Sequence, residues 1–319
     1  MASGDPAPPP HVVDECRGVL FVYSDGSVVR RAQPGFSTPV RDDGSVEWKD
    51  ATFDAARGLG LRLYRPRQDL TAARRLPVFF YYHGGGFCIG SRAWPNCQNY
   101  CLRLAADLGA LVVAPDYRLA PEHRLPAALD DGAAALLWVA SAADPWVAES
   151  ADLARVFVSG DSAGGTIAHH LAVRFGSAAG IRGYVQLMPF FGGTERTRSE
   201  AECPDDAFLN RDLNDRYWRL SLPEGATADH PVANPFGAGA PPLEAVDFAP
   251  TLVVVGGRDI LHDRAVDYAA RLRAMGKPVE VRDFEGQLHG FFTIDPWSDA
   301  SAQLMRVIKR FVDSDGRFD

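Results

Sequence analysis

The sequence of 319 residues contains no run of about 18 apolar residues, and its first ten residues include no lysine or arginine. A membrane-spanning helix needs such an apolar run, and a secretory signal peptide needs basic residues near its start. We therefore predict neither. No Asn-x-Ser/Thr tripeptide occurs, as expected of a protein that does not meet the glycosylation machinery. These absences favour a cytoplasmic protein without a membrane partner, with the nucleus as the alternative location.

Cysteine is scarce, and basic residues do not outnumber acidic ones. The five cysteines are an odd number without the spacing of a zinc site. Cys97 and Cys101 stand four residues apart on a predicted helix, where core packing is the favoured role. The formal net charge of −8 and the scattered basic residues argue against a nucleic-acid partner. We therefore expect no nucleic acid, no metal and no organic cofactor.

Short apolar runs alternate with helical patterns along most of the chain. Such runs suit strands buried on both faces of a parallel sheet. They cover residues 78–82, 111–114, 156–159, 184–188 and 251–255, and further strands are predicted at residues 61–64 and 279–284. Helices are predicted over residues 94–108, 126–143, 166–175, about 265–272 and about 304–311, and a hairpin over 18–31. This alternation predicts an α/β fold, with a mostly parallel central sheet flanked by helices, in a single domain spanning residues 1–319.

The stretch of residues 190–250 interrupts the alternation. It is rich in proline and holds one aromatic helix candidate near residues 213–220. A long interruption between two sheet strands is more often a functional cap than a linker. We therefore expect residues 190–250 to form a cap insertion over the site.

A Gly-x-Ser-x-Gly pentapeptide occupies residues 160–164, between the strand predicted at 156–159 and a helical stretch. This strand–turn–helix context is that of a nucleophile elbow, where the sharp turn leaves no room for side chains beside the serine. The turn also places Ser162 at a helix N-terminus, where the helix dipole favours developing negative charge. The pentapeptide alone is a common coincidence, but its position predicts Ser162 as a nucleophile.

Three consecutive glycines follow the strand predicted at 78–82, within His-Gly-Gly-Gly-Phe at residues 83–87. Glycines let backbone N–H groups approach a substrate oxygen, and such a loop upstream of an elbow is typical of an oxyanion hole. We predict the N–H groups of Gly85, Gly86 and Ala163 as its donors. A plain tight turn or a phosphate loop is the alternative, although a phosphate loop needs a Lys-Ser/Thr pair after the glycines. His83 is expected to stabilise the loop.

Two aspartates compete to be the acid partner of a catalytic base. Asp259 follows the strand predicted at 251–255, and catalytic groups of open α/β sheets gather at such carboxyl ends. Asp263 lies four residues on, where it is expected to cap or pair in the next helix. We predict Asp259, in the order Ser, Asp, His that this kind of fold uses.

His289 is the predicted general base. It lies in a glycine-flanked loop after the strand at 279–284 and before the last helix. From there an imidazole can reach the serine, with Asp259 fixing its tautomer. The other histidines downstream of the elbow, which have no such loop, are His169, His170, His230 and His262.

With HGGGF at 83–87, DYRLAPEH at 116–123 and GDSAGG at 160–165, the chain resembles the hormone-sensitive-lipase-like carboxylesterases. The likeness covers roughly residues 60–315 and implies an α/β-hydrolase fold. Within that family the chain looks like the plant carboxylesterases, a group that includes gibberellin receptors and a 2-hydroxyisoflavanone dehydratase. The receptors lack the triad histidine and the dehydratases can carry threonine as nucleophile. Because Ser162 and His289 are both present, the resemblance implies hydrolysis.

Three further segments, residues 190–197, 217–223 and 229–237, resemble the strigolactone-hydrolysing branch of these enzymes. The acid of that branch can be glutamate, whereas Asp259 stands here; both side chains ionise. By the same analogy, residues 10–35 would help to cover the active site. The resemblance thus implies a small-molecule ester or lactone as substrate.

Aromatic residues near these motifs predict an apolar pocket suited to a hydrophobic small molecule. The candidates are Phe87, Phe190, Phe191, Trp218 and Phe292, with core packing as the alternative for at least half of them. The predicted activity is that of a serine carboxylesterase acting through an acyl-enzyme. A hormone-binding receptor that keeps its triad and a lyase of the dehydratase type are the alternatives.

Overall fold

The computed structural model describes residues 9–32, 38–67 and 75–318, and the chain forms two compact units, residues 1–37 and 38–319. In the smaller unit, β1 (Val12–Cys16), β2 (Leu20–Tyr23) and β3 (Val28–Arg30) form an antiparallel sheet in that order. The hairpin predicted at 18–31 is confirmed as β2 and β3. The covering role of residues 10–35 stays a prediction, and residues 33–35 of that range lie outside the described residues.

The larger unit is built on one mixed, mostly parallel sheet, which confirms the predicted α/β architecture. In the described part of the chain it has eight strands, in the order β11-β10-β9-β8-β6-β7-β5-β4. Only β5 runs in the direction opposite to that of the other strands there. The strands are β4 (Val46–Asp54), β5 (Leu59–Pro66), β6 (Leu76–Tyr82), β7 (Leu111–Pro115), β8 (Ala151–Asp161), β9 (Ile181–Leu187), β10 (Thr251–Gly256) and β11 (Val279–Phe284).

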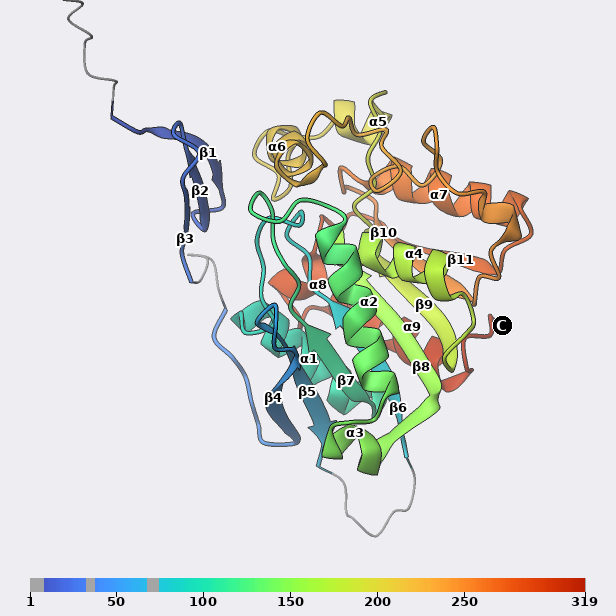
Figure 1. Cartoon of the computed structure of the whole chain (residues 1–319). Helices are drawn as coiled ribbons and strands as arrows, with labels where there is room; N and C mark the ends of the chain where they lie inside the picture. The colour runs from blue at the N-terminus through green and yellow to red at the C-terminus, as the bar shows by residue number, and fades with distance from the viewer. Residues whose placement is uncertain (1–8, 33–37, 68–74, 319) are drawn as a thin grey trace, which may run out of the picture. The chain divides into compact units, whose positions relative to one another are not determined.

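Helices cover both faces of this sheet (Figure 1). On one face α1 (Pro95–Leu108), α8 (Phe291–Ile294) and α9 (Asp299–Asp313) pack against one another and the strands in a continuous apolar core. On the other face α2 (Ala127–Ala140) and α4 (Ala163–Phe175) pack together, α4 against β8 and β9, and α7 (His262–Ala274) packs against β10 and β11. A short helix, α3 (Pro145–Ser150), precedes β8.

Strand β4 was not predicted, because its residues do not form an apolar run. It alternates partly buried and exposed side chains and pairs with β5 alone, at the edge of the sheet. An edge strand buries one face only, so its sequence alternates apolar and charged residues. By contrast β6 is buried along its whole length, as a central strand must be.

The predicted interruption lies between β9 and β10, which are adjacent in the sheet. It contains α5 (Arg198–Ala201), α6 (Arg211–Ser221) and a short 3-10 helix, Leu243–Ala245. The aromatic helix predicted at 213–220 is confirmed as α6. Figure 1 shows α5 and α6 together at one end of the sheet.

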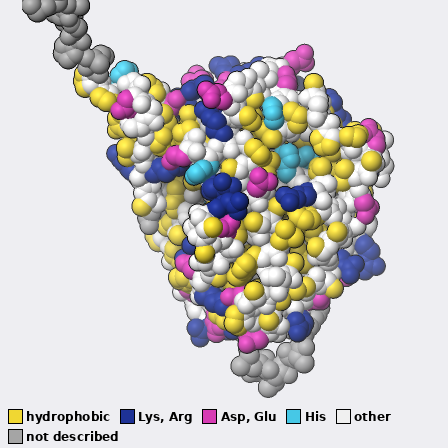
Figure 2. All heavy atoms as spheres, viewed as in Figure 1, with side chains coloured by type: hydrophobic (Ala, Val, Ile, Leu, Met, Phe, Trp, Pro, Cys, Tyr) yellow, Lys and Arg dark blue, Asp and Glu magenta, His cyan; other side chains and the backbone are white. Residues whose placement is uncertain are grey.

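Acidic and basic side chains are interspersed on the face shown in Figure 2, where no broad area of one sign appears. Within the described residues, no helix is both long and apolar enough to cross a membrane.

Candidate active site

Ser162 occupies a strained turn between β8 and α4. Its φ of +52° and ψ of −116° place a non-glycine residue in a conformation that side chains rarely adopt. A Cβ on Gly164 would overlap the carbonyl oxygen of Tyr82 at the end of β6. The glycine therefore lets α4 begin directly against the central strand, which leaves the sharp turn at the strand end.

Hydrogen bonds at both backbone groups of Ser162 hold this strained conformation. Its N–H donates to the carbonyl of Leu187 (2.9 Å), the last residue of β9. Its carbonyl accepts from the N–H of Phe190 (2.9 Å) and from that of Thr166 (3.1 Å). The serine is thus fixed to the carboxyl end of the neighbouring strand.

The glycine loop after β6 packs tightly against α6. Gly86 has a φ of +58°, and a Cβ there would overlap the ring of Tyr217. The carbonyl of Gly85 accepts from the N–H groups of Cys88 (2.9 Å) and Ile89 (3.0 Å), which closes the loop on itself. In the hydrogen bonds of the described residues, the N–H groups of Gly85, Gly86 and Ala163 have no protein acceptor. Donors in this condition are what an oxyanion requires.

Asp161, the residue before the serine, joins the elbow to the glycine loop. Its buried carboxylate accepts from the hydroxyl of Tyr81 (2.7 Å) and lies against Gly84, where a Cβ would overlap one of its oxygens. Burial raises the pKa of this carboxyl, against the opposing effects of the Tyr81 hydrogen bond and of the charges of His289 and His83. The sequence analysis did not single out Asp161, because its partner Tyr81 lies 80 residues away in the chain.

His83 and Tyr117 brace the same loop. Their rings stack at 4.4 Å between centroids, and the Tyr117 hydroxyl donates to the His83 carbonyl (2.8 Å). His83 Nδ1 lies 2.8 Å from the carbonyl oxygen of Gly84. These contacts agree with the supporting role predicted for His83.

His289 and Asp259 form a buried hydrogen-bonded pair. Nδ1 of His289 lies 2.8 Å from Oδ2 of Asp259, and Oδ1 of Asp259 accepts from the Leu261 N–H (3.0 Å). Asp263, the competitor, is engaged elsewhere. Its carboxylate accepts from the N–H of Ser199 in α5 (2.8 Å) and lies 3.0 Å from Nδ1 of His262.

The loop that carries His289 lies at the same edge of the sheet as Ser162. The residue after it, Gly290, places its N–H 3.2 Å from Sδ of Met188. Met188 directly follows Leu187, whose carbonyl holds the Ser162 N–H. The structure therefore places Ser162 after β8, Asp259 after β10 and His289 after β11, at the same edge of the sheet.

The remaining histidines downstream of the elbow have other partners. His169 Nδ1 lies 2.9 Å from the Tyr268 hydroxyl, and His170 Nε2 lies 3.1 Å from the Val232 carbonyl. His262 lies between Asp263 and Asp283, and His230 Nδ1 accepts from the Val232 N–H (3.2 Å). Among the described residues, no group of three or more His, Cys, Asp or Glu could hold a metal ion.

The five predicted pocket aromatics divide into three locations. Phe87, Phe190 and Trp218 cluster beside the elbow, with centroid distances of 6.3 Å (Phe87–Phe190), 6.1 Å (Phe87–Trp218) and 4.0 Å (Phe190–Trp218). Phe191 instead packs on Tyr268 and His169, beneath α4 and α7. Phe292 packs on Tyr100 in the core on the α1 face of the sheet. The structure thus brings three of the five together, and the sequence analysis missed Tyr217, their neighbour on α6.

Known proteins resemble the chain over most of its length. A profile of the α/β hydrolase fold matches residues 79–293. The chain is 35% identical over 308 residues to the chloroplastic tuliposide A-converting enzyme 2 of Tulipa gesneriana, covering 94% of this chain and 78% of the relative. It is 36% identical over 312 residues to a gibberellin receptor of Oryza sativa subsp. japonica, covering 91% and 86%. A solved esterase of Pyrobaculum calidifontis matches with a TM-score of 0.73 at 31% identity, over 86% of each chain.

Proposed function

The chain belongs to the α/β hydrolase family and is a carboxylic ester hydrolase, and from this premise we propose that Ser162 is its nucleophile. Ser162 attacks the carbonyl of a small ester or lactone and forms an acyl-enzyme. Water activated by His289 then releases the acid. The strained turn and its place at the N-terminus of α4 support the role of Ser162.

His289 acts as general base and then as general acid. The Nδ1–H of His289 donates to the carboxylate of Asp259, which leaves Nε2 to exchange the proton with the serine and the leaving group. This buried pair, at the strand end where Ser162 is held, is the observation that carries the proposal. The N–H groups of Gly85, Gly86 and Ala163 would stabilise the tetrahedral oxyanion.

The direct test is hydrolysis of p-nitrophenyl acetate by the purified protein and by Ser162→Ala. We expect steady turnover by the first and loss of nearly all of it in the second. A fluorophosphonate probe should label the wild-type protein and not the variant. Wild-type turnover by Ser162→Ala would overturn the assignment.

The narrower proposal is a hydrophobic substrate of the strigolactone type. It rests on the resemblance of residues 190–197, 217–223 and 229–237 to the strigolactone-hydrolysing branch. The test assays a strigolactone-type lactone beside short-chain acyl esters, with the products identified. Ester cleavage without lactone cleavage would end the narrower proposal and leave the esterase intact. An acid product also separates hydrolysis from a dehydratase-type elimination.

The cytoplasmic location stays a prediction, since a relative 35% identical is chloroplastic.

A hormone receptor is the second candidate, because a relative 36% identical is named a gibberellin receptor. Receptor binding would be stoichiometric, with one ligand held intact per chain. Multiple turnovers by the wild-type protein, lost in Ser162→Ala, would decide for the enzyme. Saturable binding of a hydrophobic carboxylic acid without any turnover of esters would decide for the receptor.

A further inference from the structure

Helix α6 of the cap insertion lies directly on the predicted oxyanion loop. The Tyr217 ring fills the space in front of Gly86, and Sγ of Cys88 lies 3.8 Å from the Tyr217 carbonyl. The next residue along the helix, Trp218, is buried beside the elbow. The position of the Trp218 indole is therefore coupled to the reacting centre.

Trp218 and Phe190 form a two-ring layer next to the nucleophile. Their rings are parallel within 2° and stack at 4.0 Å between centroids. The Phe190 N–H donates to the Ser162 carbonyl, and the Phe190 carbonyl accepts from the Thr166 hydroxyl, so this residue cannot move away independently of the elbow. Phe87, which follows Gly86, contacts both rings.

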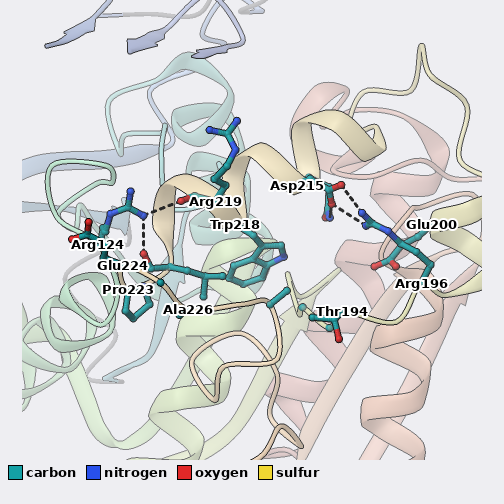
Figure 3. A pocket seen from close by; sticks show the side chains of 16 residues that line it. Arg124, Thr194, Arg196, Glu200, Asp215, Trp218, Arg219, Pro223, Glu224 and Ala226 are labelled. Atoms are coloured by element: carbon teal, nitrogen blue, oxygen red, sulfur yellow. Dashed lines mark hydrogen bonds and ion pairs between the residues drawn. The ribbon is translucent and has the colours of Figure 1, made fainter. Parts of the chain in front are cut away.

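Trp218 also lines a pocket of about 460 Å³, and neither Phe190 nor Ser162 is among the residues that line it. Figure 3 shows the indole between Ala226 and Thr194. The apolar or small residues of its lining include Gly192, Trp218, Leu222, Pro223, Ala226 and Ala228. A pocket of this size accommodates a small-molecule group.

We propose that the Phe190–Trp218 pair is the specificity-determining wall of the site and restricts the enzyme to esters with a compact group on the α6 side of the carbonyl. This inference rests on the proposed esterase function. The wall separates the nucleophile from the pocket lined by Ala226. A longer alkyl group would otherwise extend into that pocket, where each buried methylene strengthens binding roughly fourfold.

The test measures kcat/KM for two series of esters. In one, the acyl chain of p-nitrophenyl esters is lengthened from acetate to decanoate; in the other, the alcohol of acetate esters is lengthened likewise. Trp218→Ala should raise the ratio of long-chain to acetate activity at least 10-fold in one of the two series, because two or more methylenes enter the pocket. An unchanged ratio in both series would overturn the proposal.

Two variants test whether the changed activity ratio comes from loss of the Phe190–Trp218 wall or from a general loosening of the site. Trp218→Phe keeps the ring stack and removes an indole N–H that has no hydrogen-bond partner among the described residues, so it should keep the wild-type ratio. The double variant Trp218→Ala with Ala226→Trp fills the pocket with the new indole. It should return the ratio of long-chain to acetate activity to within about threefold of wild type, which is less than the effect of one buried methylene. A ratio that stays high in this double variant would show that the extra chain lies elsewhere.

Acetate activity distinguishes failure of the wall from failure of the proposed function. If the wild-type protein hydrolyses acetate and Ser162→Ala does not, the function stands whatever the chain-length result. Should Trp218→Ala show no cooperative unfolding, Trp218→Leu leaves a smaller void and is measured in the same way. A gain in long-chain activity there supports the wall, and its absence in a folded variant refutes it.

Discussion

The Nδ1 atom of His289 lies 2.8 Å from a carboxylate oxygen of Asp259, while Asp263, four residues further on, is bound to Ser199 and His262. The two aspartates are close in sequence and face different partners. Of the two, Asp259 is therefore the one placed to hold the tautomer of His289 that accepts a proton at Nε2.

We therefore expect Asp259→Asn to lower kcat by about 1,000- to 10,000-fold, because the amide favours the wrong imidazole tautomer. Asp263→Asn is the matched control and should change kcat by less than about threefold, a difference within 0.7 kcal/mol. The measurement is steady-state hydrolysis of p-nitrophenyl acetate by both variants. Equal losses in the two would contradict the assigned acid.

The backbone strain at Ser162 should appear as a cost in stability. Ser162→Gly abolishes activity and relieves the positive φ, so its free energy of unfolding should rise by about 1 kcal/mol. Ser162→Ala also abolishes activity but keeps a Cβ at φ +52°, so it should show no such rise. Urea unfolding of the two inactive variants gives the difference directly. Equal stabilities would show that the turn is not strained.

A Cβ on Gly86 would meet the Tyr217 ring, whereas Gly109 has a similar φ (+59°) and nothing within 4 Å of its would-be Cβ. Gly86→Ala should therefore displace an oxyanion donor and lower kcat about 100-fold. Gly109→Ala carries the same backbone penalty of about 1 kcal/mol but should leave kcat unchanged. Kinetics and urea unfolding on both variants separate the clash from the backbone penalty. Unchanged kcat in Gly86→Ala would remove this loop from the mechanism.

The stability of the protein should fall at mildly acidic pH because of His169. Burial, reinforced by the charge of His170, holds the pKa of His169 well below 6.5 in the folded protein. The unfolded chain then binds a proton that the folded protein does not. The contribution of neutral His169 is thus complete above about pH 6.5 and decreases as the pH falls toward the folded pKa, by up to about 1.4 kcal/mol per pH unit.

Urea unfolding between pH 8 and pH 5 measures this dependence. His169→Gln should flatten the acid side of the profile, with the exposed His123→Gln as the matched control. The same acid-side slope in His169→Gln and wild type would contradict the prediction.

The elbow and the glycine loop could be predicted from sequence because each is a local pattern at a strand end. Ser162, Gly85 and Gly86 all follow directly from a buried strand, and the parallel sheet brings those strand ends together. Sequence order likewise placed His289 in a loop after β11. What made these predictions possible is that the chemistry depends on short segments and on sheet geometry.

Packing across the chain could not be predicted in this way. Phe190 and Phe191 are consecutive, yet one faces Trp218 and the other faces Tyr268, because the chain after β9 turns between two layers. The choice between Asp259 and Asp263 depended on Ser199, 64 residues from Asp263. Such contacts depend on tertiary structure, and a local sequence pattern does not predict them.

The insertion between β9 and β10 leaves and re-enters the sheet at adjacent strands. Its two attachment points are therefore side by side, so the insertion can be exchanged for another one while the sheet stays the same. Replacing residues 190–250 by the equivalent segment of a relative would alter Trp218, Tyr217 and their pocket together, while the strand ends that hold Ser162 and Asp259 stay as they are. Substrate preference in such proteins can diverge by grafting, without any redesign of the sheet.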